Sequence, residues 1–355
     1  MIEKYEKLMQ ICLDEALKYR FDVAPNPMVA AIVYDENEDK IVSLGVHKKF
    51  GENHAEVNAV ENAGDIDFSD KTLIVNLEPC AHQGKTPPCA DLIIQKGFKK
   101  VVIGTYDPNP LVCSMGVMKL KNAGIEVAVG VLEQKCKELN KVFIKNITRK
   151  LPYVTVKIAT TLDSKIVTQG GESKWITGEQ ARDYVQRLRA QHFGILSGSG
   201  TVLADNPALT CRIKGERSPE RIIIDRHGKI SFDYQVFKDD STRVFLATNN
   251  FERDFPKNVV PIEFVNFRDL FSKLYNYGVY SILIETGKTI LTAVLKQQMA
   301  DEIYKFVSPK IFGSGMDFVG NLNIFKINEA LKLDFTGMEK VGEDALVKAK
   351  FLYEE

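Results

Sequence analysis

An apolar run, TLIVN at 72–76, leads directly into a loop with two cysteines, LEPCAHQGKTPPC at 77–89. The run is short and rich in β-branched residues, so it predicts a buried strand. Cys80 and Cys89 stand among proline, histidine and glycine rather than in an apolar stretch, which favours a metal site over core packing. The segment therefore predicts a strand whose end carries candidate metal ligands.

Helices and strands alternate on both sides of this segment. Proline, glycine and charged turns separate the apolar stretches. Such alternation is typical of a layered α/β domain with a largely parallel sheet. The expected elements are helices at 5–19, from about 55, from about 90, at 116–122 and at 133–143, and strands at 28–34, 41–46, 72–76, 100–104 and 125–129.

The chain of 355 residues is long enough for two domains of roughly 150 residues each. Pro152 cannot continue a helix, and a new strand is expected directly after it. We therefore expect domains at 1–146 and 151–355. The second is again α/β but does not repeat the first. Its expected elements are strands at 153–158, 193–196, 221–225, 243–247, 281–285, 302–308 and 346–353, and helices at 178–191, 268–277 and 289–298.

Composition excludes several classes of protein. Lys plus Arg and Asp plus Glu number 47 each, so the net charge is zero, which argues against a nucleic-acid-binding protein. The first twenty residues are charged and amphipathic, unlike a signal peptide, and no run approaches the ~20 apolar residues of a membrane span. Six cysteines without such a signal do not indicate a disulfide framework. We expect a soluble, cytoplasmic protein without a nucleic-acid or membrane partner.

His54, Cys80 and Cys89 form a candidate zinc site. A catalytic zinc ion takes three nitrogen or sulfur ligands from the protein and keeps one position for water, which it activates near neutral pH. Glu56 lies two helical positions from His54, so the two side chains do not project together. Glu56 is therefore the candidate proton carrier between the attacking water and the departing ammonia. H-x-E followed by P-C-x-x-C is a zinc-deaminase signature, although eight residues separate the cysteines here.

The sequence between the two cysteines resembles that of one family, the bifunctional deaminase–reductase of riboflavin biosynthesis. That family carries P-N-P, H-A-E, L-E-P-C-x-H-x-G-[RK]-T-P-P-C and D-P-N-P, which stand here at 25–27, 54–56, 77–89 and 107–110. The resemblance implies a cytidine-deaminase-like α/β/α domain. It also implies that five residues hold the pyrimidine or its ribose phosphate: Asn26, His47, His82, Lys85 and Asn109.

From the residues alone, Asn26 and Asn109 are equally well explained as turn formers, and His47 as a strand-end histidine. One departure from the family concerns the next loop. The family usually continues D-P-N-P with a glycine–basic–glycine stretch, whereas this chain has Cys113-Ser114-Met115-Gly116. A basic side chain is therefore missing where one could contact the substrate phosphate.

The second half lacks a G-x-G-x-x-G fingerprint. Instead, a small-residue stretch, Ser197-Gly198-Ser199-Gly200-Thr201, follows an expected strand, and a similar turn stands at 284–289. Small residues between a strand and a helix let backbone N–H groups approach a phosphate. Because no acidic residue follows the glycine loop on a Rossmann unit, we expect NADPH to be preferred to NADH.

The resemblance extends through this half, where the family typically shows S-L-D-G-K-I, S-x-W-I-T-G, G-x-G-T-V and D-[DN]-P-x-L-T. These stand here as TLDSKI at 161–166, SKWITG at 173–178, GSGTV at 198–202 and DNPALT at 205–210, with Ser164 and Thr286 at positions where the family has glycine. The resemblance implies a dihydrofolate-reductase-like α/β domain. The implied NADPH contacts are Ala159, Trp175, Thr201, Asp205 and Gly287, and the implied substrate contacts are Ser173, Arg189, Leu209, Arg212 and Glu285. From the residues alone, Trp175 would be core and Arg189 a solvated charge.

The resemblance thus implies two successive reactions on a small molecule. The first is zinc-dependent deamination of 2,5-diamino-6-(5-phosphoribosylamino)pyrimidin-4-one. The second is NADPH-dependent reduction of its ribosyl chain, giving 5-amino-6-(5-phosphoribitylamino)uracil. A nucleic-acid deaminase would share His54 and Glu56, but the zero net charge and the second domain argue against it. A zinc-stabilised scaffold would not need the free carboxylate of Glu56. A homo-oligomer is possible.

Overall fold

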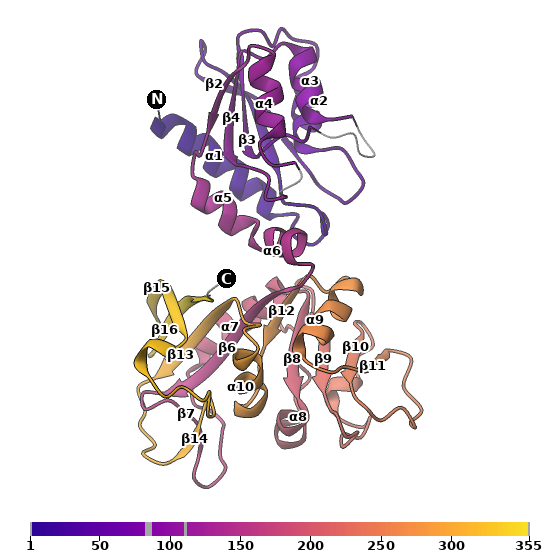
Figure 1. Ribbon diagram of the computed structural model, residues 1–355, viewed down its shortest axis with the longest axis vertical. Helices are drawn as coiled ribbons and strands as arrows, with labels where there is room; N and C mark the ends of the chain where they lie inside the picture. The colour runs from indigo at the N-terminus through magenta and orange to yellow at the C-terminus, as the bar shows by residue number, and fades with distance from the viewer. Residues whose placement is uncertain (1, 82–86, 110–111, 354–355) are drawn as a thin grey trace. The chain divides into compact units, whose positions relative to one another are not determined.

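The structure is a computed structural model and describes residues 2–81, 87–109 and 112–353. The chain divides into two compact units, Met1–Lys150 and Leu151–Glu355 (Figure 1). None of the helices among the described residues combines the length and the apolar character needed to cross a bilayer. Each unit has its own sheet and its own core.

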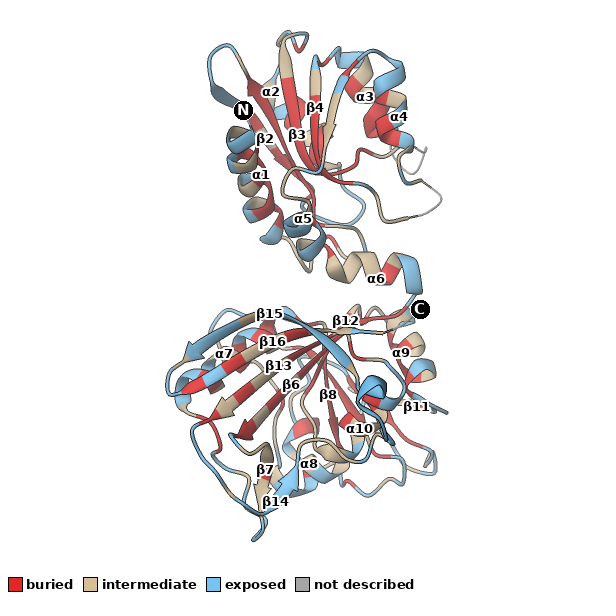
Figure 2. Cartoon of the chain, turned by 60° about the vertical axis from the view of Figure 1, so that its left-hand side comes forward, coloured by how far each residue is buried: buried red, intermediate tan, exposed pale blue. Residues whose placement is uncertain are grey.

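The first unit is built on a five-stranded sheet in the order β2-β1-β3-β4-β5. β1 (Ala30–Asp35) runs antiparallel to β2 (Lys40–Val46) and to β3 (Lys71–Leu77). β3, β4 (Lys100–Thr105) and β5 (Glu126–Val129) are parallel to one another. β1 is buried throughout, and β3 and β4 almost throughout (Figure 2), which explains why they are continuous apolar runs rather than alternating ones.

Helices cover both faces of this sheet. Successive strand residues point to opposite faces, so Ala31 and Val33 pack with one group of helices, and Ala30 and Ile32 with the other. The first group is α2 (Ala55–Ala63), α3 (Cys89–Lys96) and α4 (Met115–Asn122), and the second is α1 (Ile2–Leu17) and α5 (Glu133–Leu139). The layered α/β prediction is confirmed for this unit.

The expected helix at 133–143 is broken into two helices, α5 and α6 (Lys141–Arg149), at Asn140. The buried Asn140 amide accepts a hydrogen bond from Met28 N (2.8 Å) and donates one to Met28 O (3.0 Å). Asn76 also donates to Met28 O, at 2.9 Å. Two buried amides therefore fix the backbone beside Asn26, a predicted site residue.

The second unit contains a nine-stranded sheet in the order β11-β10-β9-β8-β12-β6-β13-β16-β15. The seven strands from β11 to β13 are parallel, and β16 and β15 are antiparallel additions at one edge. The strands are β6 (Tyr153–Thr161), β8 (Gly194–Gly198), β9 (Glu220–Ile224), β10 (Val244–Ala247), β11 (Val259–Ile262), β12 (Ser281–Ile284), β13 (Glu302–Ser308), β15 (Lys332–Val341) and β16 (Asp344–Leu352), and β7 (Lys165–Thr168) pairs separately with β14 (Gly315–Asp317).

Helices again pack on both faces. α9 (Phe267–Asn276) and α10 (Lys288–Lys296) share one core cluster with the sheet, whereas α7 (Glu179–Gln191) and α8 (Ser199–Asp205) belong to the clusters of the other face. β7, β11, β14 and β15 were not expected from the sequence. β15 is exposed along most of its length and contains glycine and charged residues, so it lacks the alternation of a half-buried strand.

Candidate active sites

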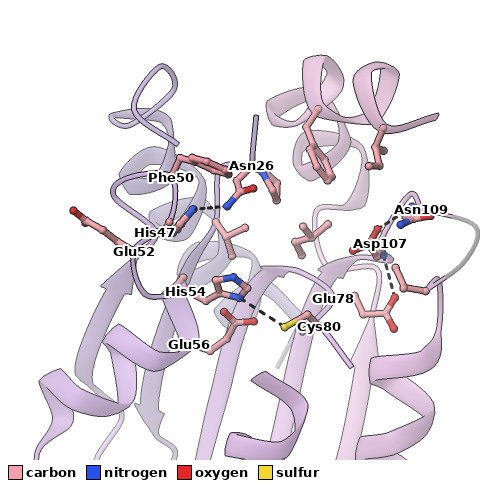
Figure 3. Close-up of a pocket in the computed structure, with 18 residues that line it drawn as sticks. Asn26, His47, Phe50, Glu52, His54, Glu56, Glu78, Cys80, Asp107 and Asn109 are labelled. Atoms are coloured by element: carbon pink, nitrogen blue, oxygen red, sulfur yellow. Dashed lines mark hydrogen bonds between the residues drawn. The ribbon is translucent and has the colours of Figure 1, made fainter. Parts of the chain in front are cut away.

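Three predicted zinc ligands come together beyond the carboxyl end of β3, the central strand of the first sheet. His54 directly precedes α2, Cys80 follows β3, and Cys89 begins α3. His54 Nδ1 lies 3.7 Å from Cys80 Sγ (Figure 3) and 3.3 Å from Cys89 Sγ, and the three ligand atoms are all within 4.8 Å of one another. A tetrahedral zinc ion with bonds of ~2.0–2.3 Å places its ligands at about this separation. The donor set therefore fits zinc.

The two thiols differ in their readiness to ionise. The Cys89 thiol and the Cys89 N–H, 3.3 Å from Cys80 Sγ, both donate to Cys80 and lower the pKa of that thiol to about 4. The pKa of Cys89 is raised because it shares its proton with Cys80 and is buried. One thiolate is thus available at neutral pH, and the thiolate is the form that binds a metal.

Glu56 lies in the first turn of α2 and is only 4% exposed. Burial, together with the charge of Cys80, raises the pKa of Glu56 to about 7. Figure 3 shows its carboxylate beside His54. A carboxyl group that titrates near neutral pH is able both to take up and to release a proton.

His54, Cys80 and Glu56 line a cavity of about 340 Å³. Asn26, His47 and Asn109 line this cavity, so the structure brings together the predicted deaminase residues that it describes. Asn26 Nδ2 lies 3.1 Å from His47 Nε2, and burial lowers the pKa of His47, which favours its neutral ring. His82 and Lys85 lie outside the described residues. Phe50, Phe143 and Ile147 add an apolar wall that the sequence did not indicate.

Glu78 is a further residue of this site, and its role was not inferred from the sequence. Its Oε2 accepts hydrogen bonds from Asp107 N and Ser114 N, both at 3.0 Å, and its Oε1 accepts one from Val117 N at 3.1 Å. The carboxylate, 4% exposed, therefore fastens the loop that carries Asn109 to the strand end that carries Cys80. The only available signal was its place in the L-E-P-C motif.

The loop that departs from the family pattern has a left-handed residue. Ser114 has φ 67°, in the region that favours glycine. Two positions later a glycine is required, because a Cβ on Gly116 would lie 2.1 Å from Pro79 O. Met115, where the family has a basic residue, is 48% exposed. The loop thus has a glycine-like backbone conformation at Ser114, as the family's glycine–basic–glycine pattern would give, but Met115 replaces the basic side chain.

In the second unit, two predicted phosphate loops follow neighbouring parallel strands. Residues 199–201 follow β8, which ends at Gly198, and residues 285–289 follow β12, which pairs with β8. A Cβ on Gly200 or Gly287 would meet nothing within 4 Å, so both loops leave space for a ligand. A Cβ on Gly198 would lie 2.3 Å from Ile290 and 3.6 Å from Thr286 Oγ1. This cradle at the carboxyl ends of parallel strands fits a dinucleotide.

Arg189 and Glu285, both predicted to contact the substrate, bind each other. Arg189 Nε and Nη2 donate to the Glu285 carboxylate at 2.7 and 3.1 Å, and Arg189 Nη1 donates to Thr210 O at 3.0 Å. Lys157 Nζ lies 3.6 Å from the same carboxylate. Burial alone would raise the pKa of Glu285, but the two cations outweigh it and hold the pKa at about 2. Arg189 is therefore a buried structural partner and not a solvated charge.

The remaining predicted reductase residues lie on the strands and loops around this cluster. Trp175 is 63% exposed, with the Arg182 guanidinium 4.7 Å from its ring centroid, so it is not a core residue. Asp205 pairs with Lys174 at 2.9 Å. Leu209 is buried and has φ 56°. Arg212 is exposed, and three further residues are half-buried: Ala159, Ser173 and Thr201.

Comparison with known proteins gives the family. Residues 2–105 match the model of the cytidine and deoxycytidylate deaminase zinc-binding region, and residues 152–347 match that of the RibD C-terminal domain. The riboflavin biosynthesis protein RibD of Aquifex aeolicus is 40% identical over 355 residues, which cover 98% of this chain and 99% of that protein. The chain belongs to the RibD family.

Solved structures agree with this assignment. A Thermotoga maritima crystal structure, described as a diaminohydroxyphosphoribosylaminopyrimidine deaminase/5-amino-6-(5-phosphoribosylamino)uracil reductase, has a TM-score of 0.88 at 40% identity and covers 99% of both chains. Acinetobacter baumannii RibD has a TM-score of 0.85 at 32% identity, over 99% of this chain and 100% of that one.

RibD is a bifunctional deaminase and reductase of riboflavin biosynthesis, with a zinc-binding deaminase domain and an NADPH-dependent reductase domain. The predicted family, its two activities, its two cofactors and the pair of cytidine-deaminase-like and dihydrofolate-reductase-like folds are therefore confirmed.

Proposed function

We propose that this member of the RibD family deaminates 2,5-diamino-6-(5-phosphoribosylamino)pyrimidin-4-one and then reduces the ribosyl chain of the product to ribityl. The observation that carries the proposal is the cluster of His54, Cys80 and Cys89 beside the buried Glu56 carboxylate, with His54, Cys80 and Glu56 in the wall of a cavity of about 340 Å³. A cavity of this size accommodates a small ring compound. The similar Thermotoga maritima protein is described by the same two activities, which supports the proposal.

For the deaminase, His54, Cys80 and Cys89 are the zinc ligands, and zinc bound by them supplies a water activated for attack at neutral pH. Glu56 accepts a proton from this water and gives it to the amine that leaves as ammonia, a task suited to its pKa of about 7. Asn26, His47 and Asn109 hold the pyrimidine and its ribose phosphate from the cavity wall. His82 and Lys85 complete the proposed contacts.

For the reductase, NADPH when bound supplies the hydride for the sugar carbon attached to the pyrimidine amine. The protein contributes orientation. Ala159, Trp175, Thr201, Asp205 and Gly287 are proposed to contact NADPH, and Ser173, Leu209, Arg212 and Glu285 the substrate. Because the Arg189 guanidinium donates two hydrogen bonds to Glu285, Arg189 is proposed to act on the substrate by holding this carboxylate in position. The exposed Arg212 is better placed to bind the substrate phosphate.

We also propose that the enzyme works in the cytoplasm on these small molecules, without a nucleic-acid or membrane partner. The equal numbers of basic and acidic residues support the exclusion of nucleic acid.

A pair of variants tests the deaminase assignment. Cys80→Ser is expected to lose zinc and ammonia release while the NADPH-dependent reduction of the deaminated substrate continues. Glu56→Gln is the matched control, because it cannot carry a proton but leaves the ligands in place; it should keep about one zinc per chain and lose ~10²-fold or more in deamination. Metal analysis and the two activity assays give the answer. Full zinc occupancy in Cys80→Ser would overturn the ligand assignment.

A further inference from the structure

We propose that Lys310 is a positioning residue of the reductase, which holds Trp175 in place for NADPH. The inference rests on the proposed function, in which Trp175 contacts the cofactor, and adds a residue that acts through it. Lys310 stands two residues after β13 and belongs to none of the residue sets named above. Three observations support the proposal: the exposure of the Trp175 ring, the hydrogen bonds that Lys310 donates, and the way in which Lys310 is itself fixed.

The Trp175 ring is not held by burial. It is 63% exposed, whereas the next residue, Ile176, is 8% exposed and packs in the core of the unit. Residues 173–178, all of them described, belong to no helix or strand, so the regular hydrogen bonds of these elements do not hold the stretch. An exposed ring presents a defined face to a ligand only where neighbouring residues fix its backbone.

Lys310 makes contacts of this kind. Its Nζ donates to Trp175 O at 3.0 Å and to Ile176 O at 2.8 Å. An ammonium group has three N–H donors, so both hydrogen bonds form at once, and the charge of the donor strengthens them. Lys310 thus ties the exposed Trp175 to the buried Ile176. The Trp175 backbone moves away from the core only by losing at least one of these bonds.

The ring itself lies against Arg182. The Arg182 guanidinium is 4.7 Å from the ring centroid of Trp175, and its Nη1 donates to Thr177 O at 2.8 Å. A cation over an aromatic ring covers one face of that ring. Lys310 therefore fixes the backbone of Trp175 while Arg182 covers one face, which leaves the opposite face of an exposed ring for the cofactor.

Lys310 is fixed at its own backbone. Its carbonyl oxygen accepts a hydrogen bond from Leu162 N at 2.8 Å, in the turn that follows β6. The Asp163 carboxylate in the same turn accepts the N–H groups of Phe312 at 3.2 Å and Gly313 at 2.8 Å. Because β6 and β13 are paired neighbours, these contacts fasten the segment after β13 to the sheet. Lys310 thus relates the position of Trp175 to that of the sheet.

The chain offers a matched control in Lys273. This lysine lies in α9 of the same unit, and its Nζ donates to a backbone carbonyl, Glu263 O, at 2.8 Å and to the Asp269 carboxylate at 2.9 Å. Methionine in either place keeps an unbranched apolar stem and removes the ammonium group. Lys310→Met and Lys273→Met therefore each remove one cation from a backbone carbonyl, but only the first of these carbonyls belongs to Trp175.

Two measurements on the full-length protein test the proposal. Trp175 is the single tryptophan, so the anisotropy of its fluorescence reports directly on the motion of this ring. In Lys310→Met the anisotropy should fall and the KM for NADPH should rise about five- to tenfold, while kcat and the KM for the pyrimidine stay within about twofold. Lys273→Met should change none of these quantities.

An unchanged KM for NADPH in Lys310→Met overturns the proposal, and so does an equal rise in both KM values, which a general loosening of the unit would give. Unfolding followed by circular dichroism checks the fold of the variant. If methionine lowers the unfolding midpoint, Lys310→Gln replaces it, with the same split expected at a rise of about threefold. A wild type that does not reduce the pyrimidine with NADPH overturns the reductase assignment itself, so the two failures are distinguishable.

Discussion

Glu56 in the first unit and Glu285 in the second are both carboxylates withdrawn from water, yet their pKa values are displaced in opposite directions. Burial raises the pKa of Glu56 to about 7. At Glu285 the same effect is outweighed by Arg189 and Lys157, and the pKa is about 2. The first carboxyl can exchange a proton near neutral pH, whereas the second stays ionised as a fixed charge. The two sites thus use one functional group for two tasks, set by its neighbours.

The largest expected effect concerns the fixed charge. Arg189→Ala leaves the Glu285 carboxylate buried with Lys157 as its remaining cationic partner, and breaking a buried pair in this way costs about 3–5 kcal/mol. Trp175 is the single tryptophan, so its fluorescence during denaturant unfolding reports on the second unit alone. The unfolding midpoint should fall markedly. An unchanged midpoint would show that the pair does not stabilise the unit.

Arg212→Ala is the control for this variant. Arg212 is exposed, so its loss should leave the midpoint unchanged while raising the reductase KM for the phosphorylated substrate.

The stability effect of the Arg189 pair should also depend on pH. Because the folded pKa of Glu285 is lowered, the stabilisation is complete above its ordinary value of 4.5 and is lost as the pH falls toward 2.

The two sites also differ in how much of them the sequence reveals. The predicted zinc ligands stand in short motifs whose residue types are restricted by metal chemistry, and the expected strand and helix starts bring them together. The partnership of Arg189 and Glu285 joins residues 96 positions apart, and no local pattern contains it. From the residues alone, Arg189 was expected to be a solvated charge, and the family resemblance implied a contact with the substrate. Its neighbours became visible only once β12 was placed beside β8 and β6.

The elements of the fold also differ in how far the sequence predicts them. Buried parallel strands such as β3 and β4 were predicted because burial on both faces makes them continuous apolar runs. β15 was missed because it is an exposed edge strand whose pairing with β16 is determined by the partner strand and not by its own pattern. Glu78 was missed for a related reason, since its three backbone partners lie 29 to 39 positions away.

Glu78 provides the second prediction, of intermediate size. Glu78→Gln replaces one acceptor oxygen by an N–H₂ group that faces backbone N–H donors, and a hydrogen bond to a charged group contributes about 1.5–3 kcal/mol. The loop that carries Asn109 should loosen, and the deaminase KM should rise about tenfold or more while zinc stays at about one per chain. Steady-state kinetics and metal analysis measure both.

The control for Glu78 is Glu126→Gln, which removes an exposed carboxylate paired with Lys100 and should change neither quantity. A structural role alone would lower stability and activity together, so the split between KM and kcat is informative. If kcat falls and KM does not, Glu78 acts on the reacting groups and not on the position of the loop.

The smallest expected effect is a gain in stability at Ser114. A residue other than glycine with φ near 67° costs about 1–2 kcal/mol, whereas glycine costs about 0.5–1 kcal/mol through the freedom of the unfolded chain. Ser114→Gly should therefore stabilise the first unit by roughly 0.5–1 kcal/mol. Hydrogen exchange of α4 peptides in the full chain should slow about two- to fivefold. Ser69→Gly, at an exposed position without a positive φ, should instead speed exchange in its own segment. If Ser114→Gly also speeds exchange, the extra freedom of glycine in the unfolded chain outweighs the relief of strain at φ 67°, because the backbone hydrogen bond from residue 114 N to Glu78 is the same in both proteins.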